Sequence, residues 1–216
     1  MTITWLGQSC FKIQIGDVTL VTDPYNSEVG FKLPRLTADI VTVSHDHFDH
    51  NNIEGVSGPE GATPFVISSP GEFEVKGVFV YGSAFWHDKN EGKDRGQNIA
   101  YCIEAEGISL AHLGDLGHEL SEEQIEKFDG VDILFVPVGG KWTLGASEAV
   151  KVINEIEPRI VIPMHYKIPG FKVDVETIDK FLKEMGASKA EKLPKLKISK
   201  KDLPQEETKV IVLEKS

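Results

Sequence analysis

The segment Ser44-His45-Asp46-His47-Phe48-Asp49-His50 decides how this chain is interpreted. It contains three of the seven histidines of the protein, arranged in the pattern H-x-H-x-D-H. The segment follows directly after Ile40–Val43, a largely apolar run that predicts a β-strand. The histidines are therefore expected at the carboxyl end of that strand, which is where open sheets bind their ligands.

The spacing of this motif suits metal binding. Residues two apart in extended backbone project to the same side, so His45 and His47 can bind one ion. Asp49 and His50 leave in other directions as the chain turns, and they suit a second ion beside the first. Imidazole and carboxylate ligands suit zinc, iron or manganese, and the lack of cysteine ligands argues against a closed structural zinc site. The alternative interpretation is surface histidines in a turn or one adventitious ion, and the length of the motif favours the two-metal centre.

Further ligands are available at or soon after other predicted strands. They are Asp115 after Ile108–His112, His165 after Arg159–Pro163, His87 after Val78–Tyr81 and Asp23 after Val18–Thr22. Each of these residues alone is weak evidence for a metal site, because a lone histidine beside apolar residues is usually a hydrogen-bonded core residue. Together they supply the ligands that a second ion requires. His112 lies within its strand and is expected to pack or hydrogen-bond beside the site, whereas His87 lies in a polar loop that can turn inward.

Short apolar runs separated by turn signals predict strands in the first half of the chain. Besides the strands named above, these runs are Ile3–Leu6, Phe11–Ile15, Phe65–Ile67 and Ile99–Ile103. Gly16-Asp17 is a two-residue hairpin signal, and the stretch between Asp23 and Asp39 is expected to be a loop.

The second half alternates predicted strands and helices. Helices are expected from Ser121, which pairs with Gln124 in a capping box, to about Phe128, from Ser147 through Ile156, and from Asp174 to about Met185. The apolar face of the second helix comprises Ala149, Val150, Ile153 and Ile156. Ile133–Val136 predicts a central buried strand and Val210–Leu213 a final one. This order indicates an α/β fold of two packed sheets with helices outside, and residues 1–216 are expected to form a single domain.

Composition narrows the function classes. Apolar residues make up 40% of the chain and charged residues 26%, a balance typical of a folded domain. The formal net charge is −11 and no basic stripe is present, so no nucleic-acid partner is expected. The lysine-rich stretch Lys189–Lys201 is expected to be a solvated linker. Without a secretory signal or a membrane-spanning run, and with only Cys10 and Cys102 as reduced core thiols, a cytoplasmic protein without membrane contact is expected.

These residues resemble the metallo-β-lactamase superfamily, in particular its branch of Zn-dependent hydrolases similar to L-ascorbate 6-phosphate lactonases. The resemblance covers nearly the whole chain, and Trp5–Phe11 resembles the first hairpin of that branch. One departure is Gln8, where the branch often has histidine, which leaves the role of this position open. The resemblance implies a four-layer αβ/βα sandwich of two mixed β-sheets, with helices on the outer faces and the metals at one edge of the sheets.

The resemblance also implies a division of the ligands between two ions. The first ion is held by His45, His47 and His87, the second by Asp49, His50 and His165, and both by Asp115 as the bridge. Asp23 is expected to accept an N–H from a ligand histidine and thereby fix its tautomer. Asp49 is also expected to orient the attacking hydroxide or move its proton.

The sequence therefore predicts a hydrolase with two divalent metal ions, zinc being favoured over manganese or iron. A lactone or another small ester is the substrate class implied by the resemblance, and an anionic substituent is compatible with it. The rival interpretations are a phosphodiesterase for small phosphodiesters and a metal-binding protein with little hydrolysis. Whether the protein forms a homo-oligomer is left open. So are the roles of Arg95, Asn98, His118 and Lys141, which could meet an anionic substrate.

Overall fold

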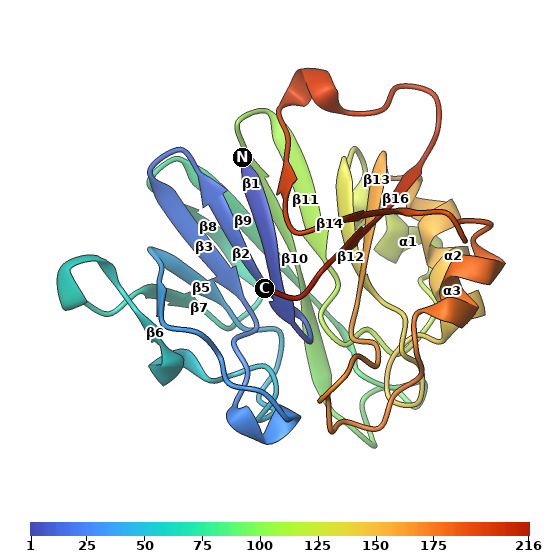
Figure 1. The fold of residues 1–216 in the computed structure, drawn as a ribbon, viewed down its shortest axis with the longest axis horizontal. Coiled ribbons are helices and arrows are strands. Elements are labelled where there is room, and N and C mark those ends of the chain that lie inside the picture. Colours follow the sequence, from blue (N-terminus) through green and yellow to red (C-terminus); the bar gives the residue numbers. More distant parts are fainter.

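Two mixed β-sheets lie face to face in the computed structural model, which describes all 216 residues (Figure 1). One sheet has six strands and the other eight, and a separate two-stranded pair lies apart from both. Each large sheet combines an antiparallel part with a parallel part. The α/β sandwich of two mixed sheets predicted from the sequence is thus confirmed.

The strands follow one another across each sheet in a defined order. The six-stranded sheet consists of β15 (Leu196–Lys197), β1 (Thr2–Gly7), β2 (Cys10–Ile15), β3 (Val18–Thr22), β5 (Ile40–Thr42) and β7 (Phe65–Ile67). The eight-stranded sheet consists of β14 (Glu191–Leu193), β16 (Lys209–Leu213), β13 (Ile160–Met164), β12 (Ile133–Pro137), β11 (Ile108–His112), β10 (Gln97–Ala105), β9 (Val78–Trp86) and β8 (Gly71–Val75). The pair consists of β4 (Leu36–Thr37) and β6 (Val56–Ser57).

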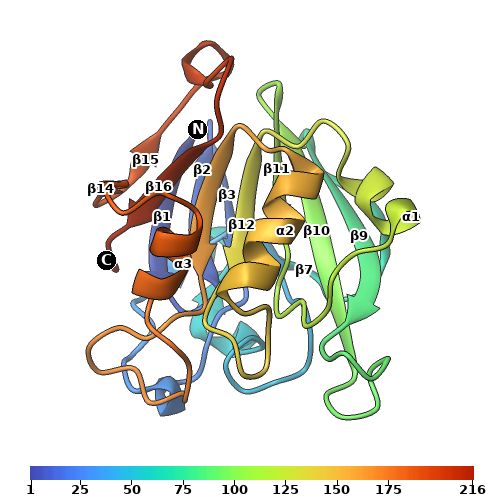
Figure 2. The same cartoon turned by 90° about the vertical axis from the view of Figure 1, so that its right-hand side faces the viewer.

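The helices are short and few. They are α1 (Glu122–Ile125), α2 (Ala146–Ile156) and α3 (Asp179–Glu184), with 3-10 turns η1 (Ser27–Val29), η2 (Ile53–Gly55), η3 (Pro59–Gly61), η4 (Glu126–Phe128) and η5 (Lys200–Asp202). Figure 2 shows α2 and α3 across the outer face of the eight-stranded sheet. No helix combines the length and the apolar character that a membrane crossing requires.

Loops with 3-10 turns cover the outer face of the six-stranded sheet. Leu20 on β3 belongs to the main core between the sheets, whereas its neighbour Val21 belongs to a second, smaller core. This is the alternation expected of a strand with both faces covered. Tyr25, Val29 and Phe171 from the covering loops pack into the second core.

Three sequence predictions about local structure are wrong. The stretch Lys189–Lys201 is not a linker, because β14 pairs with β16 and β15 pairs with β1, and the apolar side chain of Leu196 is buried between lysines. The segment before α3 is not helical from Asp174 onward. There the backbone bonds to neighbouring loops instead of to itself: Glu176 N–H donates to Gly139 O at 2.8 Å.

The third wrong prediction concerns the start of α2. Gly145 is its N-cap, and its N–H donates to the Glu148 carboxylate at 2.9 Å, so Ser147 lies inside the first turn. Val152 rather than Val150 is fully buried on the apolar face. In contrast, the capping box of Ser121 with Gln124 is present as predicted.

The contact between Phe11 on β2 and Phe135 on β12 joins the two sheets, with ring centroids 4.4 Å apart and both side chains fully buried. We predict that Phe135→Ala lowers the free energy of unfolding by about 3–5 kcal/mol, because it removes a buried ring and leaves a cavity. The matched control is Phe79→Ala, whose side chain is 44% exposed and should change stability by about 0.5 kcal/mol at most. Urea unfolding of the two variants checks this, and equal losses would contradict it.

Candidate metal centre

Loops from both sheets bring the predicted ligands together at one edge. The H-x-H-x-D-H segment follows β5 of the six-stranded sheet, whereas His87, Asp115 and His165 follow β9, β11 and β13 of the eight-stranded sheet. His87 and His165 come directly after their strands, and Asp115 comes after the short turn Leu113-Gly114. The strands therefore fix where each of these side chains begins.

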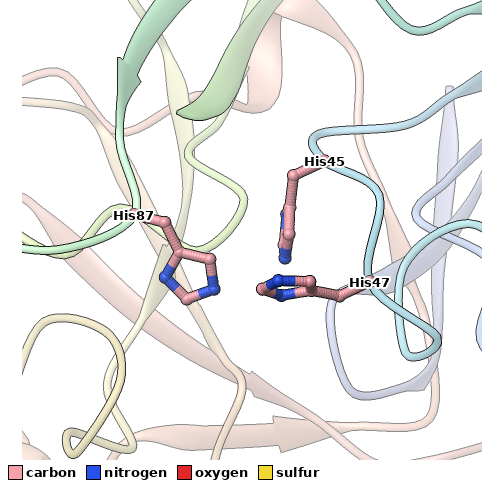
Figure 3. Close-up of side chains that lie close together, drawn as sticks. All are labelled: His45, His47 and His87. Atoms are coloured by element: carbon pink, nitrogen blue, oxygen red, sulfur yellow. The ribbon is translucent and has the colours of Figure 1, made fainter. Parts of the chain in front are cut away.

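The first group of ligands consists of His45, His47 and His87, with one nitrogen of each within 4.8 Å of the others. Figure 3 shows the three rings converging, His45 and His47 from one loop and His87 from the opposite side. The His87 Nδ1 atom lies 3.1 Å from the Trp142 carbonyl oxygen, to which it must donate a proton. Its Nε2 atom is thereby left without a proton and is free to bind a metal ion.

The second group consists of Asp49, His50 and His165, whose ligand atoms also lie within 4.8 Å of one another. All three side chains are buried. The His50 Nε2 atom lies 3.6 Å from Asp49 Oδ2. This grouping is the one that the family resemblance implied for the second ion.

Asp115 lies between the two groups. Its Oδ2 atom is 3.4 Å from His87 Nε2 and 3.1 Å from His165 Nε2, and its Oδ1 atom is 3.3 Å from His50 Nε2. Asp115 also forms a third possible ligand group with His45 from the first group and His50 from the second. A carboxylate in this position can offer an oxygen to each of two ions.

Asp23 belongs to none of the ligand groups, but it holds two of their histidines in place. The carboxylate accepts hydrogen bonds from Ser44 N at 2.8 Å, from Ser44 Oγ at 2.6 Å and from His50 Nδ1 at 2.8 Å. Because Ser44 Oγ donates to Asp23, it must accept from His45 Nδ1, which lies 2.9 Å away. One buried carboxylate therefore fixes the tautomer of a histidine in each ligand group.

The donor set fits a metal ion. The Nε2 atom of His45 is buried and has no hydrogen-bond partner, which is costly for a polar atom unless an ion occupies the adjacent space. Imidazole and carboxylate donors without cysteine suit a catalytic zinc, manganese or iron site. The structure thus shows a histidine and aspartate cluster that is able to bind metal.

The histidines of the cluster fall into two sets, one with a raised pKa and one with a lowered pKa. Burial alone would lower the pKa of His50 and of His165, but the Asp115 carboxylate raises the pKa of both above the ordinary value. Burial lowers the pKa of His45, of His47 and of His87. Burial would raise the pKa of Asp115, yet His165 and His50 hold it well below the usual range. Positive charge is therefore stabilised around Asp115, where a bridged pair of cations would lie.

The backbone at the site adopts conformations that most residues avoid. Gln8, Asp23 and His165 have positive φ angles of 55°, 37° and 53°. Such conformations cost free energy and persist where the surrounding structure enforces them. At Gly114 a Cβ atom would lie 2.4 Å from Asn98 Oδ1, so only glycine allows the turn that presents Asp115.

Several residues of unassigned role now have clear contacts. Gln8 Nε2 donates to Asp49 Oδ2 at 2.6 Å, and Asn98 Oδ1 accepts from Asp115 N at 2.8 Å. Both are buried, so they position ligands. His118 is engaged with the backbone of Trp86, and Lys141 forms an ion pair with Asp174. Sequence reasoning assigned no role to Ser44 and Trp142, whose hydroxyl and carbonyl groups act on ligands but belong to no metal-ligand pattern.

His112 is buried outside all three ligand groups, as expected. Its Nε2 atom lies 2.8 Å from the Ser9 carbonyl oxygen, to which it donates, and its Nδ1 atom accepts from Gly114 N at 3.3 Å. Both ring nitrogens are thereby engaged, and no metal-binding nitrogen remains. Its place beside the turn before Asp115 gives it a supporting part in the site.

Comparison with known proteins identifies the family. Residues 2–165 match the β-lactamase superfamily domain. The crystal structure of a candidate Zn-dependent hydrolase of the metallo-β-lactamase superfamily from Thermotoga maritima is 37% identical, with a TM-score of 0.80, and the match covers 98% of this chain and 97% of that one. A metal-dependent hydrolase from Methanopyrus kandleri is 28% identical, over 86% of this chain and 93% of its own. One from Thermococcus onnurineus is 29% identical, over 83% and 91%. The chain belongs to the metallo-β-lactamase superfamily, as the resemblance indicated.

We predict that Asp115→Asn weakens the binding of at least one ion, because it removes the negative charge that offsets repulsion between two cations. Asp23→Asn should have a smaller effect and lower the metal affinity by about 10–100-fold, because Asp23 acts on the ligands only through hydrogen bonds. Metal titration of both purified variants measures this, with circular dichroism to show that the fold is intact. Retention of two ions by Asp115→Asn together with their loss in Asp23→Asn would show that the two roles are reversed.

We further predict that His87→Gln loses one metal equivalent, whereas His112→Gln retains the wild-type metal content. Glutamine in place of His112 keeps a donor for the Ser9 carbonyl, so this variant serves as the matched control. Elemental analysis of the two proteins makes the comparison. A metal-bound structure with a His112 nitrogen about 2.0–2.1 Å from an ion, and His87 remote from it, would contradict the assignment.

Proposed function

We propose that the protein is a metal-dependent hydrolase that uses two divalent metal ions to cleave a small ester or lactone. The observation that carries the proposal is the pair of ligand groups joined by Asp115. Relatives named as metal-dependent hydrolases and the Thermotoga maritima structure support the reaction class. Zinc is the proposed metal, with manganese or iron as alternatives of similar ligand preference.

The pocket above the ligands suits a small molecule. Its volume is about 290 Å³, and it is lined by His47, Phe48, Asp49, His87, Arg95, Asp115, Trp142, His165 and Val173. This is close to the lower end of the size range of small-molecule sites. The net charge of −11 disfavours a long nucleic-acid substrate, so a small ester, lactone or phosphodiester remains.

The residues of the site are proposed to prepare a water molecule for attack. Two divalent ions, when bound, lower the pKa of a water and offset the charge that develops on the carbonyl oxygen. Asp115 would reduce the repulsion between two bound ions. The hydrogen bonds that His50 and His87 donate to Asp23 and to the Trp142 carbonyl keep their Nε2 atoms directed inward. Gln8 holds one oxygen of Asp49, which lines the pocket and is placed to orient the water and accept its proton.

We predict close to two metal equivalents per chain after gentle purification with added zinc or manganese, and hydrolysis that a chelator abolishes. Elemental analysis measures the first. A screen of lactones, thioesters and phosphodiesters with the metal-replete protein measures the second. We expect esters or lactones to be cleaved, because this is the substrate class that the family resemblance implies.

Each part of this proposal has its own contrary outcome. A metal content that stays at zero would reject the metal centre, and a plateau at one would reduce it to a mononuclear site. Cleavage of phosphodiesters alone would favour the phosphodiesterase interpretation. Two bound metals with no hydrolysis in the screen would favour a metal-binding protein without this activity.

A further inference from the structure

Arg95 lies at the rim of the metal pocket and lines it together with the ligands His87, Asp115 and His165. Its guanidinium carbon lies 3.7 Å from the centroid of the Trp142 ring. Stacking on an aromatic face is a favourable arrangement for arginine, and it restricts the orientation of the planar group. The side chain is therefore held at the pocket.

The guanidinium group of Arg95 has no acidic partner. No carboxylate oxygen lies within 4.0 Å of it, although the chain has 34 acidic residues against 23 basic ones. Neighbouring lysines behave differently: Lys89 pairs with Glu148 and Lys141 pairs with Asp174. The hydrogen-bond donors of Arg95 are thus available to a ligand in the pocket.

A single carboxylate fixes the loop that carries Arg95. Asp88 Oδ1 accepts from Asn90 N at 2.8 Å and from Gly92 N at 3.0 Å. Its Oδ2 atom accepts from Asp94 N at 3.2 Å and from Arg95 N at 2.8 Å. The loop between β9 and β10 therefore has a defined path, and Arg95 keeps its place relative to the ligand His87.

Trp142 links this arrangement to the metal centre. Its ring supports the Arg95 guanidinium, and its carbonyl oxygen accepts the hydrogen bond from His87 Nδ1. The pocket also has an apolar lining from Trp142, Phe48 and Val173, and the first two side chains are 46% and 48% exposed. An apolar substrate body can contact these side chains while a charged group reaches Arg95.

We propose that Arg95, supported by Trp142, recognises an oxyanion on the substrate, so that the substrate is an ester or lactone with a carboxylate or phosphate substituent. This inference rests on the proposed hydrolytic function. Arginine presents a planar fork of donors that matches both groups, and its hydrogen bonds to them are charge-assisted. Arg95 then determines specificity for the charged substrate and takes no part in the cleavage itself.

The first test measures binding without turnover. Zinc-loaded wild type, Arg95→Ala, Arg95→Lys and Lys141→Ala are titrated by calorimetry with benzoate, inorganic phosphate and the neutral probe benzamide. We expect Arg95→Ala to weaken binding of at least one anion about 10-fold or more, with benzamide unchanged. Arg95→Lys should bind the anion with an affinity between those of wild type and Arg95→Ala, because lysine keeps the positive charge but lacks the planar pair of N–H donors. Lys141→Ala removes the same charge from a side chain paired with Asp174, and it should bind as wild type does.

The results separate the possible ligands. The anion with the larger loss identifies the substituent as a carboxylate or a phosphate. Unchanged affinity for both anions in Arg95→Ala would overturn the proposal, because the ions alone would then hold the anion. Metal analysis and circular dichroism of each variant check that the centre and the fold are intact.

The second test uses the ester or lactone found in the screen, as its charged form and as a neutral analogue in which a carboxamide replaces the carboxylate or a hydroxyl replaces the phosphate. We expect Arg95→Ala to raise KM about 10-fold or more for the charged form, with kcat changed little and the neutral form unaffected. Hydrolysis with no preference for the charged form would reject the inference and leave the proposed function standing. Arg95-dependent anion binding without hydrolysis of any ester would support the recognition element and reject the proposed function.

Discussion

The buried carboxylate of Asp23 is the constraint on which the metal centre depends. It accepts three hydrogen bonds, two from Ser44 and one from His50, and through the Ser44 hydroxyl it also fixes His45. A carboxylate that is fully removed from water is costly unless such partners compensate it. Because His45 and His50 belong to different ligand groups, one residue directly after β3 sets the direction of a candidate ligand in each group.

The second constraint is that the two sheets end at the same edge. His45 and His50 extend from the six-stranded sheet, while His87 and His165 extend from the eight-stranded sheet. Neither sheet alone holds a complete centre. The apolar core between them, including the contact of Phe11 with Phe135, therefore has a direct bearing on chemistry, since it sets the separation of the two halves.

The members of the histidine and aspartate cluster could be predicted because they sit at or near strand ends with a recognisable spacing. The H-x-H-x-D-H segment stands out locally, and His165 follows an apolar run. The supporting contacts could not be predicted, since they join residues far apart in sequence through groups with no pattern. Gln8 reaches Asp49 across 41 positions, and the carbonyl of Trp142 reaches His87 across 55. Only the folded chain brings these groups within hydrogen-bond distance.

The fold shows the same division between local and long-range information. Strands with apolar runs, such as β3, β7 and β11, have the predicted bounds. Edge strands such as β8, β14 and β15 could not be predicted from the sequence. An edge strand pairs with one neighbouring strand only, and its charged side chains interrupt the apolar pattern that marks a strand.

The segment after Asp174 illustrates a further cause. Its sequence permits a helix, but its backbone pairs with Gly139 and Lys167, and Val175 is buried in the second core. The loop beside the pocket is thereby shaped by tertiary contacts that outweigh local helix preference. The pocket wall that contains Val173 and Trp142 follows from this pairing. The lining of the pocket is therefore the part of the site that local sequence patterns specify least.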